Sequence, residues 1–202
     1  MDVPKTLKLP LEPLKITCTS SDCENSLHCF KATRKMKGAD QVGACRTCGA
    51  QLVDWPRVHD RNLSDVKYTF DCLRYELIRH HFWHIDIDEK AVLHARRKGV
   101  NRMRMAVASR IRKSVGLASP ARDGRQTPLE GSGNSIYYAQ HATASCCRKC
   151  MEYWHGIPQG RELTEEEINY LTELAMMFIL DRIPVLTEDG ETIPPRRGNQ
   201  DS

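Results

Sequence analysis

The sequence lacks any hydrophobic run long enough to cross a membrane. Its longest uninterrupted apolar stretch is Leu174–Leu180, whereas a membrane-spanning helix needs roughly 18 or more apolar residues. The first 17 residues carry three lysines but no apolar core of the kind found in secretory signal peptides. We therefore expect a cytoplasmic protein with no membrane partner.

Aromatic residues are scarce, at 6% of the 202 residues, which argues against a stacking platform for single-stranded nucleic acid. Apolar residues make up 40% and charged residues 28% of the chain, so it can bury a core and is not disordered as a whole. There are nine cysteines, an odd number. In a reducing compartment clustered cysteines usually bind metal rather than form disulfides, and we expect Zn²⁺ as the cofactor.

Acidic residues are missing from one stretch of the chain. The formal net charge is +4, but Ala91–Gly116 contains no Asp or Glu, while residues 162–191 hold nine acidic residues and one basic residue. A basic stretch can neutralise the phosphates of DNA or RNA, although it can equally be a solvated face or dock on the acidic C-terminal helix. Its basic residues are Arg96, Arg97, Lys98, Arg102, Arg104, Arg110, Arg112 and Lys113.

Hydrophobic spacing and capping residues predict a mainly α fold. The expected helices cover about 64–82, 88–98, 101–115, 141–155 and 164–183. The last is the clearest, because Thr164 and Glu167 form a capping-box pattern. Residues 1–60, rich in Cys, Pro and Gly, predict a small zinc-ribbon-like β segment before a helical domain over 61–186, and residues 187–202 predict a disordered tail.

The N-terminal cysteines predict a structural zinc site. Cys45 and Cys48 are separated by two residues and followed by Gly49, a spacing that lets both thiolates reach one ion around a tight turn. Cys18 and Cys23 are the best second pair, with His28 or Cys29 as alternatives. Four protein ligands leave no position for water, so this site would stabilise the fold and catalyse nothing.

The sequence after residue 122 contains a distinctive run: DGRQTP over 123–128, then YAQHATASCCRKCMEYWHGIPQGRELTEEE over 138–167. It resembles a family of small bacterial proteins with a domain of unknown function, which carries DGKQTP, AQHATA-x-CCR-x-C and WHGIP-x-GR-x-LT-x-x-E. The resemblance covers about residues 80–179. It departs where the family reads roughly GHPVFI and this chain has Gly133-Asn134-Ser135-Ile136-Tyr137. The resemblance implies no established reaction.

Two histidines and three cysteines lie close together within this run. On a helix that advances about 100° per residue, Cys147 and Cys150 lie about 60° apart, with His141 and His155 on either side. We therefore predict a second metal site formed by Cys147, Cys150, His141 and His155, with Cys146 and Cys150 as a competing pair. The alternative is a helix that packs through its Cys, Ala and Trp side chains.

These features favour a zinc-stabilised nucleic-acid-binding module. The alternative is a metal-dependent, hydrolase-like enzyme with a site where the Asp123–Pro128 loop meets the predicted 141–155 helix. Its candidate catalytic residues are His141, Arg148, Asp123 and Arg125. A third reading is an interaction adaptor that uses the acidic C-terminal part.

Overall fold

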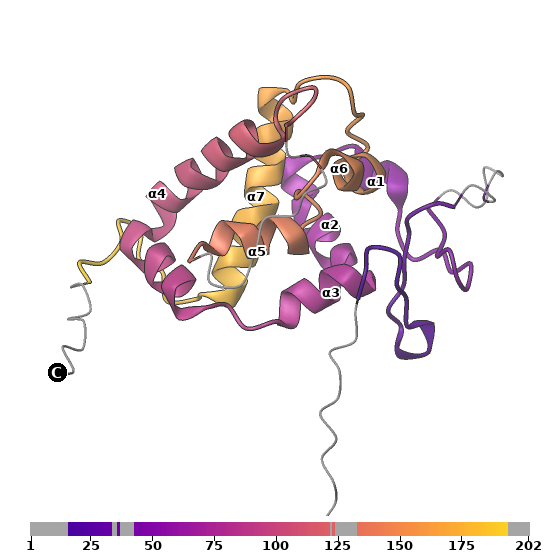
Figure 1. The fold of residues 1–202 in the computed structure, drawn as a ribbon, viewed down its shortest axis with the longest axis horizontal. Helices are drawn as coiled ribbons and strands as arrows, with labels where there is room; N and C mark the ends of the chain where they lie inside the picture. The colour runs from indigo at the N-terminus through magenta and orange to yellow at the C-terminus, as the bar shows by residue number, and fades with distance from the viewer. Residues whose placement is uncertain (1–15, 34–35, 37–42, 122, 124–132, 194–202) are drawn as a thin grey trace, which may run out of the picture.

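A computed structural model describes residues 16–33, 36, 43–121, 123 and 133–193. The predicted mainly α class is confirmed (Figure 1). Among the described residues, no helix is both long and apolar enough to cross a membrane. The α-helices are α1 Trp55–His59, α2 Val66–Cys72, α3 Leu77–His84, α4 Glu89–Val115, α5 Ser135–Ala142, α6 Arg148–His155 and α7 Glu165–Arg182.

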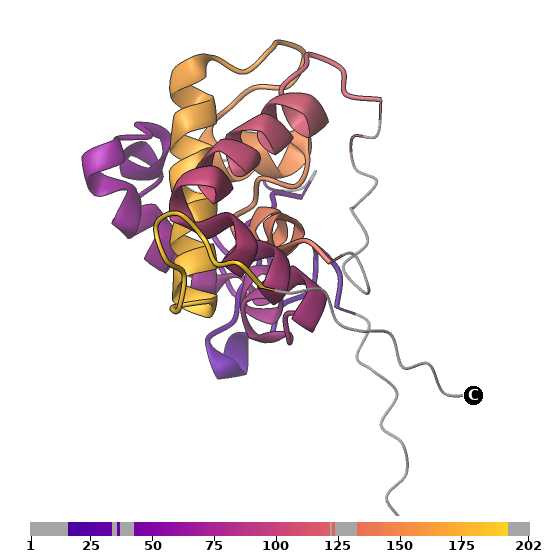
Figure 2. The ribbon, with the colours of Figure 1, turned by 90° about the vertical axis from the view of Figure 1, so that its left-hand side faces the viewer.

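Helix α7 forms the centre of the core, and helices α2, α4 and α5 pack against it (Figures 1 and 2). Its N-terminus has the predicted capping box, in which Thr164 accepts from the backbone of Glu167 and the Glu167 side chain accepts from the backbone of Thr164. This reciprocal bonding satisfies two N–H groups that lack helical partners. Its apolar stripe is buried throughout, at Ile168, Leu171, Leu174, Ala175, Phe178 and Ile179.

Helix α4 begins after Asp88, whose side chain accepts a hydrogen bond from the backbone of Ala91. It is broken at Gly99, whose backbone angles (φ 65°, ψ 178°) are accessible essentially to glycine alone. The break leaves backbone groups without helical partners, and residues 187–191 supply them. Val100 N–H donates to Thr187 and Glu191 N–H donates to Arg96 O, each at 2.9 Å.

The hydrogen bonds around Gly99 involve residues that were predicted to be part of a disordered C-terminal tail. Residues 187–191 belong to the predicted disordered tail, yet here they lie against α4 (Figure 1). The reason is local: the open backbone of the break offers hydrogen bonds that an isolated tail would not have. Residues 194–202 lie outside the described part of the chain.

Two long predicted helices are each divided in the structure. The 64–82 segment is α2 and α3, separated by a 3₁₀ turn and by Glu76 in an extended conformation. The prediction of one continuous helix over 141–155 is wrong, because α5 ends at Ala142 and α6 starts at Arg148. Between them Ala144 has φ 54° and Thr143 Oγ1 donates to the Ala139 carbonyl, so the chain turns where a continuous helix was expected.

The N-terminal segment packs onto the helical part of the molecule. His28 forms an isolated parallel bridge with Glu76, and the Phe30, Trp55 and Trp154 rings contact one another at centroid distances of 5.2–5.8 Å. Within the described part of residues 16–54 the chain forms isolated bridges and no extended strand. Part of the predicted ribbon, including residues 37–42, lies outside the described residues.

Candidate metal centres

The first candidate centre gathers Cys23, His28, Cys45 and Cys48, whose potential ligand atoms all lie within 4.8 Å of one another. The Cys23 and Cys45 sulfurs are 3.7 Å apart. His28 Nδ1 lies 3.4 Å from the sulfur of Cys48. These four residues could hold a metal ion.

These separations match the geometry of tetrahedral zinc. Zn–S bonds of about 2.3 Å place two sulfur ligands about 3.8 Å apart, and a Zn–N bond of about 2.05 Å places nitrogen and sulfur about 3.5 Å apart. Three thiolates and one imidazole are also a common structural zinc set. The residues present therefore fit Zn²⁺, and they would fill all four positions.

The Cys45–Gly49 turn is shaped to hold a thiolate. Gly49 has φ +77° and donates its N–H to the Cys45 carbonyl at 2.8 Å. Burial by itself would raise the pKa of Cys45, but hydrogen bonds involving the backbone of Cys29, Cys48 and Thr47 and the His28 ring outweigh it. They lower this pKa from 9.0 to about 6, so the ligand is ready to bind metal in its charged form.

The fourth member of this centre is His28, not the predicted Cys18. The backbone of His28 is fixed by hydrogen bonds from its N–H to Tyr75 O at 2.7 Å and from Leu77 N–H to its carbonyl at 2.9 Å. Those bonds hold the imidazole beside Cys48. Cys18 lies elsewhere, and the buried Cys29 donates to its carbonyl at 3.5 Å.

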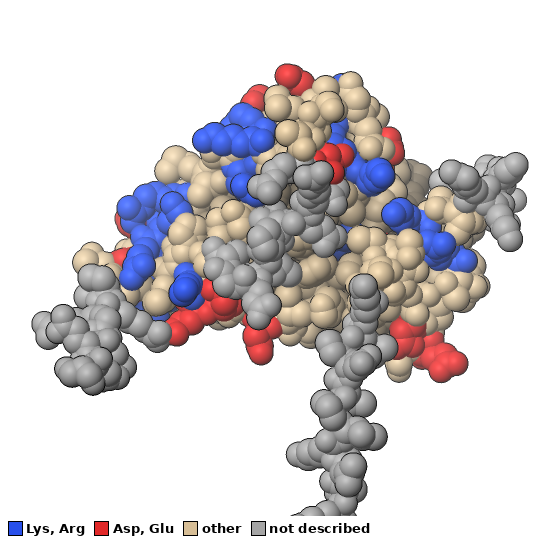
Figure 3. Space-filling model, viewed as in Figure 1, with Lys and Arg blue, Asp and Glu red and all other residues tan. Residues whose placement is uncertain are grey.

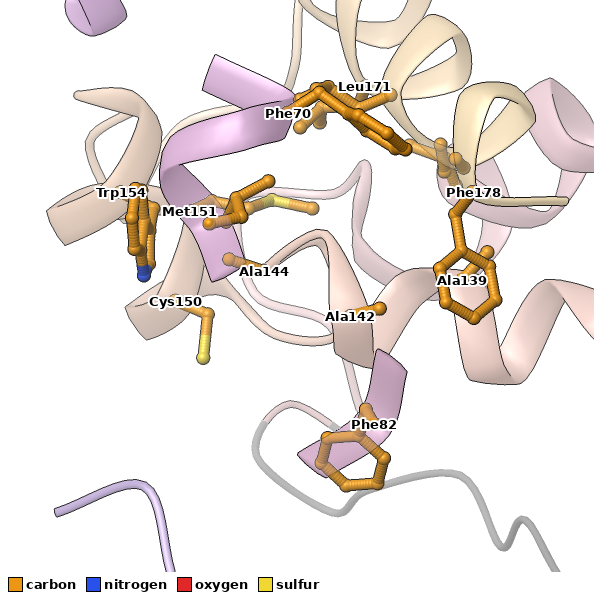
Figure 4. Close-up of a cluster of buried hydrophobic side chains, with 14 of the residues drawn as sticks. Phe70, Phe82, Ala139, Ala142, Ala144, Cys150, Met151, Trp154, Leu171 and Phe178 are labelled. Atoms are coloured by element: carbon orange, nitrogen blue, oxygen red, sulfur yellow. The ribbon is translucent and has the colours of Figure 1, made fainter. Parts of the chain in front are cut away.

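The second candidate centre lies where α6 begins. The sulfurs of Cys146, Cys147 and Cys150 lie within 4.8 Å of one another, with Cys146 and Cys150 3.8 Å apart. Figure 4 shows the Cys150 sulfur pointing away from Met151. Hydrogen bonds from the thiols of Cys146, Cys147 and Cys18 lower the pKa of Cys150. This group too could hold a metal ion.

A fully buried ion pair lies beside the second centre. Arg79 donates to the Cys150 sulfur at 3.1 Å and to the Glu76 carboxylate at 3.1 Å. Glu76 also accepts from the Tyr153 hydroxyl at 2.9 Å and from the Trp154 indole at 2.6 Å. Such a network is costly to bury unless its polar groups are satisfied, and here the thiol cluster supplies a partner for Arg79.

His141 and His155, predicted as ligands of the second centre, are not brought to it. The buried His141 ring stacks on Phe82 at a centroid distance of 4.5 Å. The Nε2 atom of His155 is 3.0 Å from the Thr143 carbonyl oxygen. Burial lowers the pKa of His155 from 6.5 to about 4. The prediction assumed one helix over both histidines, and the turn at 143–147 removes that geometry.

The candidate catalytic residues take part in bonds that hold the fold. Asp123 accepts from the backbone N–H of Arg148 at 2.8 Å, at the start of α6. The buried Arg148 guanidinium donates to the carbonyls of Val115, Pro158 and Arg161 at 3.2, 2.6 and 3.0 Å. Arg125 and the rest of its predicted loop, residues 124–128, lie outside the described residues.

The basic stretch lies on α4, and acidic residues partly neutralise it. Arg96 pairs with Glu191 and Arg112 with Glu165, each at 2.6 Å, and Arg104 pairs with Glu173. Lys and Arg side chains form separate patches rather than one continuous surface in Figure 3. Over the described residues no ion pair joins a carboxylate to Arg97, Lys98, Arg102 or Lys113.

Comparison with known proteins identifies a family but no relative of known structure. The family model described as "Domain of unknown function (DUF4186)" matches residues 67–180. This range includes α4 and the second centre, whereas the first centre precedes it. No solved structure matches the chain.

Proposed function

The chain belongs to the DUF4186 family, and from that premise we propose that it is a zinc-stabilised module that binds nucleic acid through α4. The zinc ion is held by Cys23, His28, Cys45 and Cys48. Its role is structural, because four protein ligands exclude the water that a catalytic zinc site needs.

One observation carries the zinc assignment. The Cys23 and Cys45 sulfurs are 3.7 Å apart, and His28 Nδ1 is 3.4 Å from the Cys48 sulfur. Both distances are close to the edges of a tetrahedron around one Zn²⁺. The described part of residues 16–54, which contains these ligands, forms no extended strand and no α-helix. Metal binding and folding are therefore expected to be coupled there.

Metal analysis tests the assignment directly. The Cys45→Ser/Cys48→Ser double variant should lose one zinc per chain and the ordered structure of the segment between Cys23 and Cys48. Cys72→Ser is the matched control, because Cys72 is buried in α2 and belongs to neither centre. An unchanged zinc content in the double variant, compared with the control, would exclude this site.

The nucleic-acid assignment rests on the basic residues of α4 that are not paired with a carboxylate. Arg97, Arg102 and Lys113 are exposed and have no ion pair with the described carboxylates. Because three neighbouring arginines are paired, we expect modest, non-specific affinity that depends on phosphate contacts.

Charge reversal tests this assignment. Arg97→Glu with Lys113→Glu should weaken binding to duplex DNA or RNA and reduce the slope of log K against log salt by about 1.8 if both residues contact phosphates of B-DNA. Lys67→Glu with Lys149→Glu changes the net charge equally on α2 and α6, where both lysines are exposed. Equal losses in the two variants, or no binding by the natural sequence at low salt, would refute binding through α4.

A further inference from the structure

The cysteines at the start of α6 already form most of a tetrahedral ligand set. The Cys146 and Cys150 sulfurs are 3.8 Å apart, which is the sulfur–sulfur separation expected around one Zn²⁺. Cys147 completes a group of three within 4.8 Å. The Cys146–Cys150 pair therefore has the spacing of two ligands of one ion, with Cys147 close beside it.

A fourth thiol reaches this group from the other end of the chain. The Cys18 thiol interacts with the Cys150 thiol. Cys18 lies outside the set whose members are all within 4.8 Å, so its sulfur must move closer to the other three to bind the same ion. Cys18 also lines an open hollow of about 300 Å³ with Ile78, Phe82 and three neighbours. The half-buried Cys18 side chain therefore lies at a surface that is open to solvent.

The surroundings supply the charge that such a site requires. Four thiolates and one Zn²⁺ carry a net charge of about −2, which is expensive to bury without a cation or hydrogen-bond donors. The Arg79 guanidinium is fully buried, donates to Cys150 at 3.1 Å and faces Cys146 at 3.9 Å. A buried arginine aimed at sulfur is easier to understand as the neighbour of thiolates than of neutral thiols.

We propose that Cys18, Cys146, Cys147 and Cys150 form a second, four-thiolate zinc site that fastens the N-terminal segment to the start of α6, with Arg79 as its buried counter-charge. This site does not depend on the first centre or on nucleic-acid binding. It shares no ligand with the first centre, so each can be removed separately.

The experiment measures zinc per chain on the full-length protein purified with zinc under reducing conditions. We expect two ions for the natural sequence and one for Cys18→Ala, Cys150→Ala or Cys45→Ser/Cys48→Ser. Cys29→Ala and Cys72→Ala remove buried cysteines outside both groups and should keep two ions. Cobalt substitution of the Cys45→Ser/Cys48→Ser variant should give the visible spectrum of a tetrahedral four-sulfur site.

Several outcomes would overturn the proposal. One ion in the natural protein that disappears in the Cys45→Ser/Cys48→Ser variant would leave no second site. Two ions in folded Cys18→Ala would remove Cys18 from the ligand set. A disulfide between Cys18 and Cys150, found by mass spectrometry without added oxidant, would replace the metal by a covalent bond. If Cys150→Ala fails to fold, the half-buried Cys18→Ala variant and the cobalt spectrum still decide.

Discussion

The buried His155 should make the protein lose stability in mild acid. Burial lowers its pKa from 6.5 to about 4, the hydrogen bond to the Thr143 backbone opposes this shift, and the positive charge of Arg79 adds to it. The neutral ring is well placed, because Nε2 can donate to Thr143 O at 3.0 Å while Nδ1 faces the Tyr170 hydroxyl at 3.5 Å. Protonation would put an unpaired charge into the core.

The sign and size of the effect follow from linkage. The unfolded chain binds a proton near pH 6.5 and the folded chain only near pH 4, so folding stability is complete above pH 6.5 and decreases as the pH falls towards 4. The whole shift corresponds to about 3 kcal/mol, and the part lost between pH 7.5 and pH 5.0 to about 2 kcal/mol.

Urea unfolding at pH 7.5 and 5.0 measures this loss, with His155→Gln as the comparison. Glutamine does not titrate and can still donate to the Thr143 carbonyl. Metal release by protonated thiols affects both proteins alike, so the natural protein should lose about 2 kcal/mol more than the variant. Equal losses would refute the argument, and a lower zinc content in His155→Gln would show that His155 is a metal ligand after all.

Three further substitutions test the fold. Gly99→Ala forces a side chain into a positive-φ position, with its Cβ 2.1 Å from Gly190 N. Thermal denaturation should show that the free energy of unfolding falls by at least about 1–3 kcal/mol. A smaller decrease would mean that residues 187–191 do not dock there. Glu76→Ala leaves Arg79 buried without its carboxylate and should cost about 3–5 kcal/mol in urea unfolding, whereas a neutral effect would mean that the thiol cluster alone satisfies Arg79. Thr164→Ala removes half of the capping box and should cost about 1 kcal/mol; no change in the urea midpoint would contradict the observed cap.

Elements fixed by local chemistry were predictable from the sequence. Asp88 and Thr164 cap helices because their side chains reach backbone N–H groups two or three residues ahead. Gly99 breaks α4 because it alone tolerates the angles found there. The Cys45–Gly49 turn likewise depends on five consecutive residues, and its sulfur-facing backbone follows from their spacing.

Features decided by distant residues were not predictable in the same way. From spacing alone, Cys18 and His28 are both acceptable partners for Cys23. The backbone bridge between His28 and Glu76 determines which of the two joins the centre. It places the imidazole beside Cys48 and leaves Cys18 near Cys150. The division of the 141–155 segment was missed for a similar reason, since its helical apolar spacing continues through a turn at Ala144.

The contact between Cys18 and Cys150 also sets an order of events during synthesis. A ribosome releases residues 23–48 early, so the first centre has its full ligand set while most of the helical core is still untranslated. Cys18 must wait for α6 to emerge before it can meet its partners there, and that loop closes late and at an entropic cost. During that interval Cys18 of the nascent chain has not yet met the cysteines at the start of α6. Its exposure to oxidation or to the wrong partner therefore depends on how quickly translation reaches residue 150.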